Sequence, residues 1–311
     1  MIDFTLTEEE QMFLDAASRF GAVLREQERE HEDSGYPAEL CAQYEELGFA
    51  DLEELPLGTR MSIWAKLAEA DPSAPLGLGR WPGLERPGLG AIVVEEGLSI
   101  SDGRVTGELA WLPRRRLDWL AIVGQRVWIV EDPRWEAVTR PCGLRACGGI
   151  SVSLDDPVQA IEATDIERIL RVFAAALMLG AARDAYGAAV EYAQERVAFG
   201  RPIAHHQGLA FKLADCATEL DAAELLVGSV CGHANEALLA NAVVYAHSAA
   251  ASAADCAVQV LGGHGYLTDH RVEKRMRDIR AIGALFGGSL AAETDAVDGL
   301  LNLPSALELA P

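Results

Sequence analysis

Apolar residues near the start of the chain recur at the spacing of a helix. Thr7 and Glu10 are three residues apart, as in a capping box in which each side chain bonds a free backbone N–H. Behind this pair, apolar positions from Met12 to Leu24 return every three or four residues, which predicts an amphipathic first helix. The same spacing predicts a second helix over about 38–48 and a third over about 61–70.

The pattern changes to alternation in the middle of the chain. Residues 72–90 are rich in glycine and proline and indicate a linker. After them, short apolar runs at 92–94, 98–100, 120–123, 127–130 and 150–154 are separated by turn residues such as Asp102-Gly103. This segment predicts a small, reduced antiparallel β domain.

The helical pattern returns after about residue 161 in alanine-rich stretches. The run Ile169–Ala182 is apolar nearly all round, so its helix is buried on several sides. Further helices are expected at about 207–232, 235–261 and 272–285. The predicted fold is therefore mainly α with a small β domain (α+β). We divide it into a truncated N-terminal helical domain with linker (1–85), a reduced β domain (86–160) and a C-terminal four-helix bundle for oligomerisation (161–311).

Composition narrows the class of protein. The 26 basic and 48 acidic residues give a formal charge of −22, which repels nucleic acid and anionic membranes. No stretch of about 18 uncharged apolar residues has the flanks of a membrane span, and the N-terminus lacks the pattern of a signal peptide. The six cysteines form no C-x-x-C pair, and three of them are expected to be small core residues. We expect a cytoplasmic protein without a metal site or a disulfide framework.

Two segments carry recognisable chemistry. The first runs Arg196-Val-Ala-Phe-Gly-Arg-Pro-Ile203 and precedes His206-Gln207, and the second runs Gln259-Val-Leu-Gly-Gly-His-Gly-Tyr266. Arg196 offers a forked cation suited to a pyrophosphate, and Phe199 offers a flat face to a nucleotide. Gly262 and Gly263 let the backbone approach a ligand closely. The alternative is structural: a surface cation at a helix end and a glycine helix stop.

Together with Val272-Glu-Lys-Arg-Met-Arg-Asp278, these segments resemble the C-terminal half of the acyl-CoA dehydrogenase family. The family motifs are Arg-x-x-Phe-Gly before His-Gln, and Gln-x-Leu-Gly-Gly-x-Gly before Arg-Asp. The resemblance implies an FAD that lies across a subunit interface. The cofactor-binding residues it assigns here are Arg196, Phe199, His206, Gln207, Gln259, Gly262 and Gly263.

The chain departs from this family at the catalytic base. Members carry a glutamate shortly after the Arg-Asp, in a Glu-Gly-Thr or Glu-Gly-Ser context. Counting from Asp278 places Phe286 there, or Gly287 after a slip of one residue, and neither can take a proton. Some members place the base on the first bundle helix, where this chain has Leu170. Glu167, one turn away, is a weak candidate, because its spacing from Thr164 also predicts a capping box.

The segments that surround the flavin ring in the family are also depleted. The Trp-x-Thr segment reads Trp111-Leu112-Pro113, so a proline replaces the hydroxyl and removes a backbone donor. In the family, a subunit holds the flavin ring of its own FAD and the adenosine end of its neighbour's FAD. This chain has kept the motifs for the adenosine end and has lost the base and the segments around the ring. The resemblance thus implies the non-catalytic subunit of a heterotetrameric acyl-CoA dehydrogenase, of the steroid side-chain type.

In this hypothesis a longer catalytic subunit supplies the base, the flavin ring site and most of the acyl-CoA site, and the FAD is shared. Two alternatives remain open. One is an active homomeric acyl-CoA dehydrogenase with a relocated base, for which Glu167 is the candidate. The other is a non-enzymatic scaffold subunit that stabilises a partner.

Overall fold

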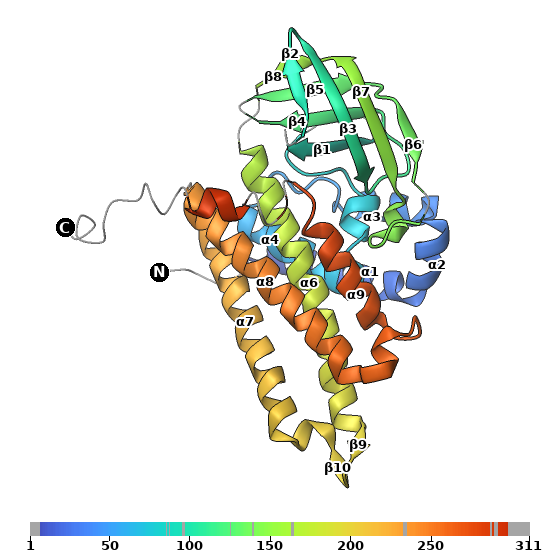
Figure 1. Cartoon of the computed structure of the whole chain (residues 1–311), viewed down its shortest axis with the longest axis vertical. Coiled ribbons are helices and arrows are strands. Elements are labelled where there is room, and N and C mark those ends of the chain that lie inside the picture. The colour runs from blue at the N-terminus through green and yellow to red at the C-terminus, as the bar shows by residue number, and fades with distance from the viewer. Residues whose placement is uncertain are drawn as a thin grey trace, which may run out of the picture.

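The computed structural model describes residues 7–84, 86, 88–94, 97–124, 126–138, 140–162, 165–232, 235–286, 288 and 292–297. Figure 1 shows strands β1 to β8 at one end of the long axis and a helical bundle that extends to the other end, where β9 and β10 lie. The N-terminal helices pack alongside the bundle, so the predicted α+β fold class is confirmed.

The N-terminal helices are α1 (Glu8–Glu26), α2 (Glu28–Ser34), α3 (Ala38–Glu46), α4 (Leu57–Ala70) and α5 (Ala74–Gly77). The predicted capping box is present at α1: the Thr7 N–H donates to Glu10 at 2.7 Å, and the Glu10 N–H donates to the Thr7 hydroxyl at 3.2 Å. Helix α1 buries Phe20, whose ring packs against Tyr44 and Phe49.

The segment predicted as a linker is instead packed. It contains α5, and its apolar side chains, including Leu76 and Trp81, are buried in the main core. The glycines and prolines that suggested a linker serve tight turns, because Pro75 begins α5 and Gly83 has a φ of 101°.

The β region forms two four-stranded sheets. The strands are β1 (Gly90–Val94), β2 (Ser99–Ser101), β3 (Arg104–Leu112), β4 (Trp119–Val123), β5 (Val127–Glu131), β6 (Trp135–Ala137), β7 (Ile150–Pro157) and β8 (Gln159–Ile161). Their orders are β1-β4-β5-β8 and β2-β3-β7-β6. The prediction of a purely antiparallel unit is wrong, because β1 and β4 pair in parallel. The chain between them runs through β2 and β3 of the other sheet, and this long excursion brings β4 back in the direction of β1.

The predicted four-helix bundle is present, with helices α6 (Ile166–Glu195), α7 (Gln207–Cys231), α8 (Glu236–Leu261) and α9 (Arg271–Ile282). Helix α6 lies at its centre and packs against α4, α7, α8 and α9. Gly180 allows the contact with α4, because a Cβ at this position would lie 2.1 Å from the Ala65 carbonyl oxygen.

Helix α8 of the bundle is strongly apolar. The stretch Ala237–Tyr266, which contains α8, has the length and composition of a membrane span, contrary to the expectation that no stretch qualifies. Half of its most apolar window is buried, and α8 packs against α6, α7 and α9. Its hydrophobicity therefore fits a core helix of the bundle.

Helix α9 carries a buried ionic cluster made of Lys274, Arg275 and Asp278. The Lys274 Nζ lies 2.8 Å from Asp71 Oδ1 and 2.7 Å from Asp278 Oδ2, and all three side chains are fully buried. Burial opposes the charge of Lys274, but the two carboxylates outweigh it and raise the pKa of Lys274 above its usual value. The ammonium therefore stays charged inside the protein.

The same cluster ties three parts of the molecule to α9. Arg275 donates to Asp184 of α6 at 2.8 Å, pairs with Glu28 of α2 and bonds the Ala70 carbonyl at the end of α4. Asp278 accepts a 2.6 Å bond from the Leu144 N–H, which precedes the 3-10 turn Arg145–Cys147 beside the β region.

We predict that Lys274→Met destabilises the protein by about 3–5 kcal/mol, because it leaves two buried carboxylates without their cation. Urea unfolding at pH 7 measures this change. Arg280→Met is the matched control on the same helix, since Arg280 pairs with Asp255 at the exposed surface, and its effect should stay below about 1 kcal/mol. Equal losses in the two variants would contradict the cluster's role.

Candidate functional site

The first motif forms a tight hairpin at the end of α6. Strand β9 (Val197–Ala198) pairs antiparallel with β10 (Arg201–Pro202), and Phe199 and Gly200 turn the chain with φ values of 54° and 79°. Two residues with positive φ make the kind of turn that twists correctly for a hairpin, but a phenylalanine is costly there. Phe199 is also 96% exposed. A strained, fully exposed aromatic is a candidate for binding rather than for packing.

His206 fixes this hairpin. Its Nε2 lies 3.1 Å from the Ala198 carbonyl oxygen, which can only accept, and its Nδ1 lies 3.3 Å from the Arg201 guanidinium, which can only donate. Both contacts are satisfied by a neutral imidazole with the proton on Nε2. The ring also meets Phe199 edge-on, with centroids 6.0 Å apart. His206 therefore orients Phe199, whereas Arg196 and Gln207 have exposed side chains.

The second motif ends α8. Gln259 is exposed, and Gly262 is the C-cap with a φ of 58°, so the helix-stop interpretation accounts for Gly262. It does not account for Gly263, which lies outside the positive-φ region and whose added Cβ would meet nothing within 4 Å. Gly265 differs, since a Cβ there would lie 2.5 Å from the Val258 carbonyl oxygen. The fold requires Gly265 but leaves open space above Gly263.

The two motifs converge at one end of the bundle, far from the two four-stranded sheets (Figure 1). A groove of about 820 Å³ between α7 and α8 is lined by Gly208 and Leu209 after the first motif and by Gln259 and Val260 of the second. Below it, Ile203 packs against a small core that contains Leu261. This end thus presents an aromatic face, a guanidinium, two primary amides and open glycine backbone, which together fit the nucleotide half of a dinucleotide.

The expected position of the base is occupied by a buried aromatic contact. Phe286 is 9% exposed and meets Trp81 edge-on, with centroids 5.5 Å apart. The Arg114 guanidinium covers the Trp81 ring at 5.0 Å and donates to the carbonyls of Gly90 and Gly79. Burial lowers the pKa of Arg114 to about 10. Gly287, the other position considered for the base, lies outside the described residues.

Little space remains beside Phe286. The cavity between Phe286, Arg171, Met178 and His247 has a volume of about 20 Å³, enough for one water molecule. Sites for drug-sized ligands and cofactors measure about 300–1,000 Å³. The cavity lined by Phe286 itself is therefore too small for a flavin ring. Pro113 is buried directly before Arg114, so the replaced threonine position also belongs to this closed packing.

Glu167 lies in the first turn of α6 and is paired. Its carboxylate lies 2.6 Å from the Arg171 guanidinium, which also pairs with Asp295. Thr164, the expected capping partner, lies outside the described residues, so the capping box stays a prediction. Leu170, at the other position used for a base, is 1% exposed within the core.

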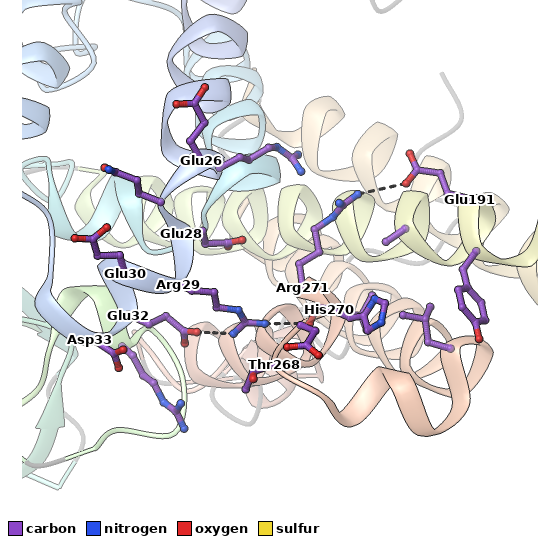
Figure 2. Close-up of a pocket in the computed structure, with 18 of the residues that line it drawn as sticks. Glu26, Glu28, Arg29, Glu30, Glu32, Asp33, Glu191, Thr268, His270 and Arg271 are labelled. Carbon is purple, nitrogen blue, oxygen red and sulfur yellow. Dashed lines mark hydrogen bonds and ion pairs between the residues drawn. The ribbon is translucent and has the colours of Figure 1, made fainter. Parts of the chain in front are cut away.

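Another cleft lies between α1–α2, α6 and the start of α9 and has a volume of about 920 Å³ (Figure 2). Its walls are charged, and Figure 2 shows an ion pair within one wall, Arg29 with Glu32 of α2, and another between α9 and α6, Arg271 with Glu191 at 3.7 Å. Ligand pockets are mostly apolar with few polar groups. This cleft is therefore better explained as a polar interface between the N-terminal helices and the bundle than as a ligand pocket.

Comparison with known proteins agrees with this arrangement. Residues 159–295 match the family model for the acyl-CoA dehydrogenase, C-terminal domain. The match covers less than half of the chain. Both motifs and the positions considered for the base lie within it.

Curated relatives match part of the chain. An acyl-CoA dehydrogenase of Bacillus subtilis is 46% identical over 119 residues, covering 35% of this chain and 30% of that protein. A 3-(aryl)acrylate reductase of Clostridium sporogenes is 37% identical over 137 residues, covering 42% and 36%. The chain therefore spans about a third of the length of these curated relatives.

Solved structures show the same fold over the whole chain. Butyryl-CoA dehydrogenase from Megasphaera elsdenii has a TM-score of 0.79 at 22% identity, covering 97% of this chain and 100% of its own. A glutaryl-CoA dehydrogenase from Mycobacterium smegmatis in complex with FADH2 has a TM-score of 0.77 at 16% identity, covering 97% and 96%. The N-terminal helices and the sheets are therefore part of an acyl-CoA dehydrogenase fold.

Two phenylalanines with the same backbone conformation test this description. Phe286 and Phe199 have φ values of 56° and 54°, but only Phe286 is buried. We predict that Phe286→Ala lowers stability by about 3 kcal/mol, because it leaves a cavity against Trp81. Phe199→Ala should change stability by no more than about 0.5 kcal/mol. Urea unfolding compares the two, and a small effect of Phe286→Ala would mean that its packing is loose enough to admit a ligand.

Proposed function

We propose that this chain is the base-lacking subunit of an FAD-dependent acyl-CoA dehydrogenase and completes the FAD site of a longer catalytic subunit. One observation carries the proposal: the exposed groups that fit a nucleotide gather at one end of the bundle, whereas the position of the base is filled by Phe286 against Trp81. Bound FAD would accept the hydride in the α,β-dehydrogenation of an acyl-CoA thioester held mainly by the partner.

The length of α6 supports a shared site. Phe286 shares a small cavity with Arg171 near the start of α6, and Arg196 caps the other end. At 1.5 Å per residue, the 25 residues between Arg171 and Arg196 span about 38 Å. A single dinucleotide does not reach across that distance. The nucleotide-binding residues of this chain must therefore serve a flavin ring that another subunit holds.

Each exposed group has a defined part in this proposal. Arg196 binds the pyrophosphate through its forked donors, and Phe199 stacks on the nucleotide base. The amides of Gln207 and Gln259 bond the adenosine and ribityl groups. The backbone at Gly262 and Gly263 lies against the cofactor, and His206 holds the hairpin in place.

The outer face of the bundle supports association with another subunit. Large apolar side chains are exposed on α7 and α8, including Phe211 at 59%, Leu225 at 52% and Leu238 at 47%. Such a concentration of exposed apolar side chains is typical of an interface. A relative in Acetobacterium woodii, 34% identical over 138 residues, is itself a subunit of a caffeyl-CoA reductase–Etf complex.

The resemblance to heterotetrameric members extends the proposal to a cytoplasmic enzyme of steroid or lipid side-chain β-oxidation. The partner is then a full-length acyl-CoA dehydrogenase subunit with an intact Glu-Gly-Thr or Glu-Gly-Ser segment. Two chains of each kind form the assembly.

We predict that co-expression of this chain with its catalytic partner gives one FAD per pair of chains, measured by flavin absorbance against protein mass. The reason is that one chain of each pair lacks room for a flavin ring. The chain purified alone should be colourless. Two FADs per pair would overturn the proposal. A yellow chain alone, bleached by acyl-CoA in a way that Glu167→Gln abolishes, would favour the homomeric enzyme.

We predict that Arg196→Ala weakens FAD binding by the pair roughly 10- to 100-fold, the value of one charge-assisted hydrogen bond. The measurement is equilibrium dialysis of FAD against the reconstituted pair. Arg104→Ala, an exposed arginine of β3, is the matched control and should leave FAD binding unchanged. Unchanged FAD affinity in Arg196→Ala, with the pair still assembled, would favour the non-enzymatic scaffold.

A further inference from the structure

Two cysteine thiols meet on adjacent helices of the bundle. Cys216 on α7 is 5% exposed, and Cys256 on α8 is half-buried. Both line the groove between α7 and α8 that also contains Gln259. The two thiols share a hydrogen-bonding interaction that shifts the pKa of both. The two side chains are therefore neighbours in this groove, which opens them to small solutes.

Two of the other cysteines have a different environment. The Cys147 thiol donates to the Ser73 carbonyl and the Cys231 thiol to the Val227 carbonyl, both at 3.2 Å. Burial raises the pKa of Cys147 to about 12 and that of Cys231 to about 11. These thiols are protonated at neutral pH and are inert core groups. Cys216 and Cys256 instead have each other as neighbours.

The pKa values of the two cysteines are shifted in opposite directions. The bond from Cys216 lowers the pKa of Cys256 to about 7, against the effect of burial and with help from Lys212. The same bond, together with burial, raises the pKa of Cys216. The other ionisable groups near the pair are Asp215, Glu219, Tyr186 of α6, Asp255 of α8 and Arg280 of α9, which neutralises Asp255. At neutral pH, a thiolate at Cys256 therefore lies beside a protonated thiol at Cys216.

We propose that Cys216 and Cys256 are a redox-active pair that a hydroperoxide, such as hydrogen peroxide, oxidises to a disulfide. Low-pKa, accessible cysteines next to a second thiol are the ones that respond to peroxide. This goes beyond the proposed function, since it needs neither FAD nor a partner. The pair lies one helical turn from Gln259, so the disulfide would join α7 to α8 beside the nucleotide-binding residues.

The chemistry balances without a further reactant. The Cys256 thiolate attacks one oxygen of hydrogen peroxide, the O–O bond breaks, and the other oxygen leaves as hydroxide, which a solvent proton converts to water. Cys256 is then a sulfenic acid. The Cys216 sulfur attacks the Cys256 sulfur, the S–O bond breaks, and the departing hydroxide takes the Cys216 proton and leaves as water. The two sulfurs lose two electrons in total, and the peroxide gains them.

The test uses the full chain at pH 7 with a small excess of hydrogen peroxide. We predict that free thiols in the denatured protein fall from six to four. Cleavage after glutamate without reductant should give a linked pair of fragments, 196–219 with 237–273. These fragments contain Cys216 and Cys256 and separate them from Cys231. Reduction should restore both fragments. Six remaining thiols, or a linkage between other cysteines, would overturn the proposal.

Substitutions distinguish a pair from two independent thiols. Cys216→Ala, which removes the thiol and leaves no donor, should abolish the linked fragments and slow alkylation of Cys256 at pH 7 roughly threefold or more, because the thiolate fraction falls further than its nucleophilicity rises. Cys142→Ala removes an exposed cysteine and is the control, so it should retain both the disulfide and the alkylation rate. If Cys216→Ala left the alkylation rate of Cys256 unchanged, the two thiols would not be coupled.

Discussion

The position of α9 depends on burying three charged side chains without leaving any of them unpaired. Lys274, Arg275 and Asp278 are completely covered. Lys274 and Arg275 pair with carboxylates from other parts of the chain, and Asp278 pairs with Lys274 and accepts the Leu144 N–H. A buried charge without its partner is costly, so α9 is stable only where Asp71, Asp184 and Glu28 meet it. This requirement fixes the N-terminal helices, α6 and the β region in one arrangement around α9.

In the proposed function, the same arrangement determines which part of a flavin site this chain can supply. The segment after α9 continues into Phe286, which the cluster holds close to Trp81 and Arg114 of the N-terminal and β regions. A glutamate at position 286 would enter this packed contact, with room for only one water beside it. Restoring the base therefore requires rebuilding the surrounding space. At the far end of α6, the hairpin with Phe199 is free of these constraints and keeps its nucleotide-binding groups exposed.

Much of the fold was predictable because long helices repeat their pattern many times. The bundle helices and the capping box at Thr7 follow directly from periodicity and local chemistry. Strand β3 was missed because its positions alternate between exposed and half-buried, and only Val105 and Leu112 are buried apolar residues. The parallel pairing of β1 with β4 was not predictable from the local pattern. It depends on the path of the intervening chain, which passes through the other sheet before it returns to β4.

The candidate site consists of residues at which suitable chemistry and exposure coincide. Arg196, Phe199, Gln207, Gln259 and Gly263 lie on the surface at one end, as a ligand-binding role requires. The sequence around Lys274 suggests a solvated charged face, and nothing local shows that its partners lie about 200 residues away at Asp71. Likewise, Cys216 and Cys256 are 40 residues apart and looked like separate core residues. Their coupling depends on the packing of α7 against α8, which the local sequence pattern does not show.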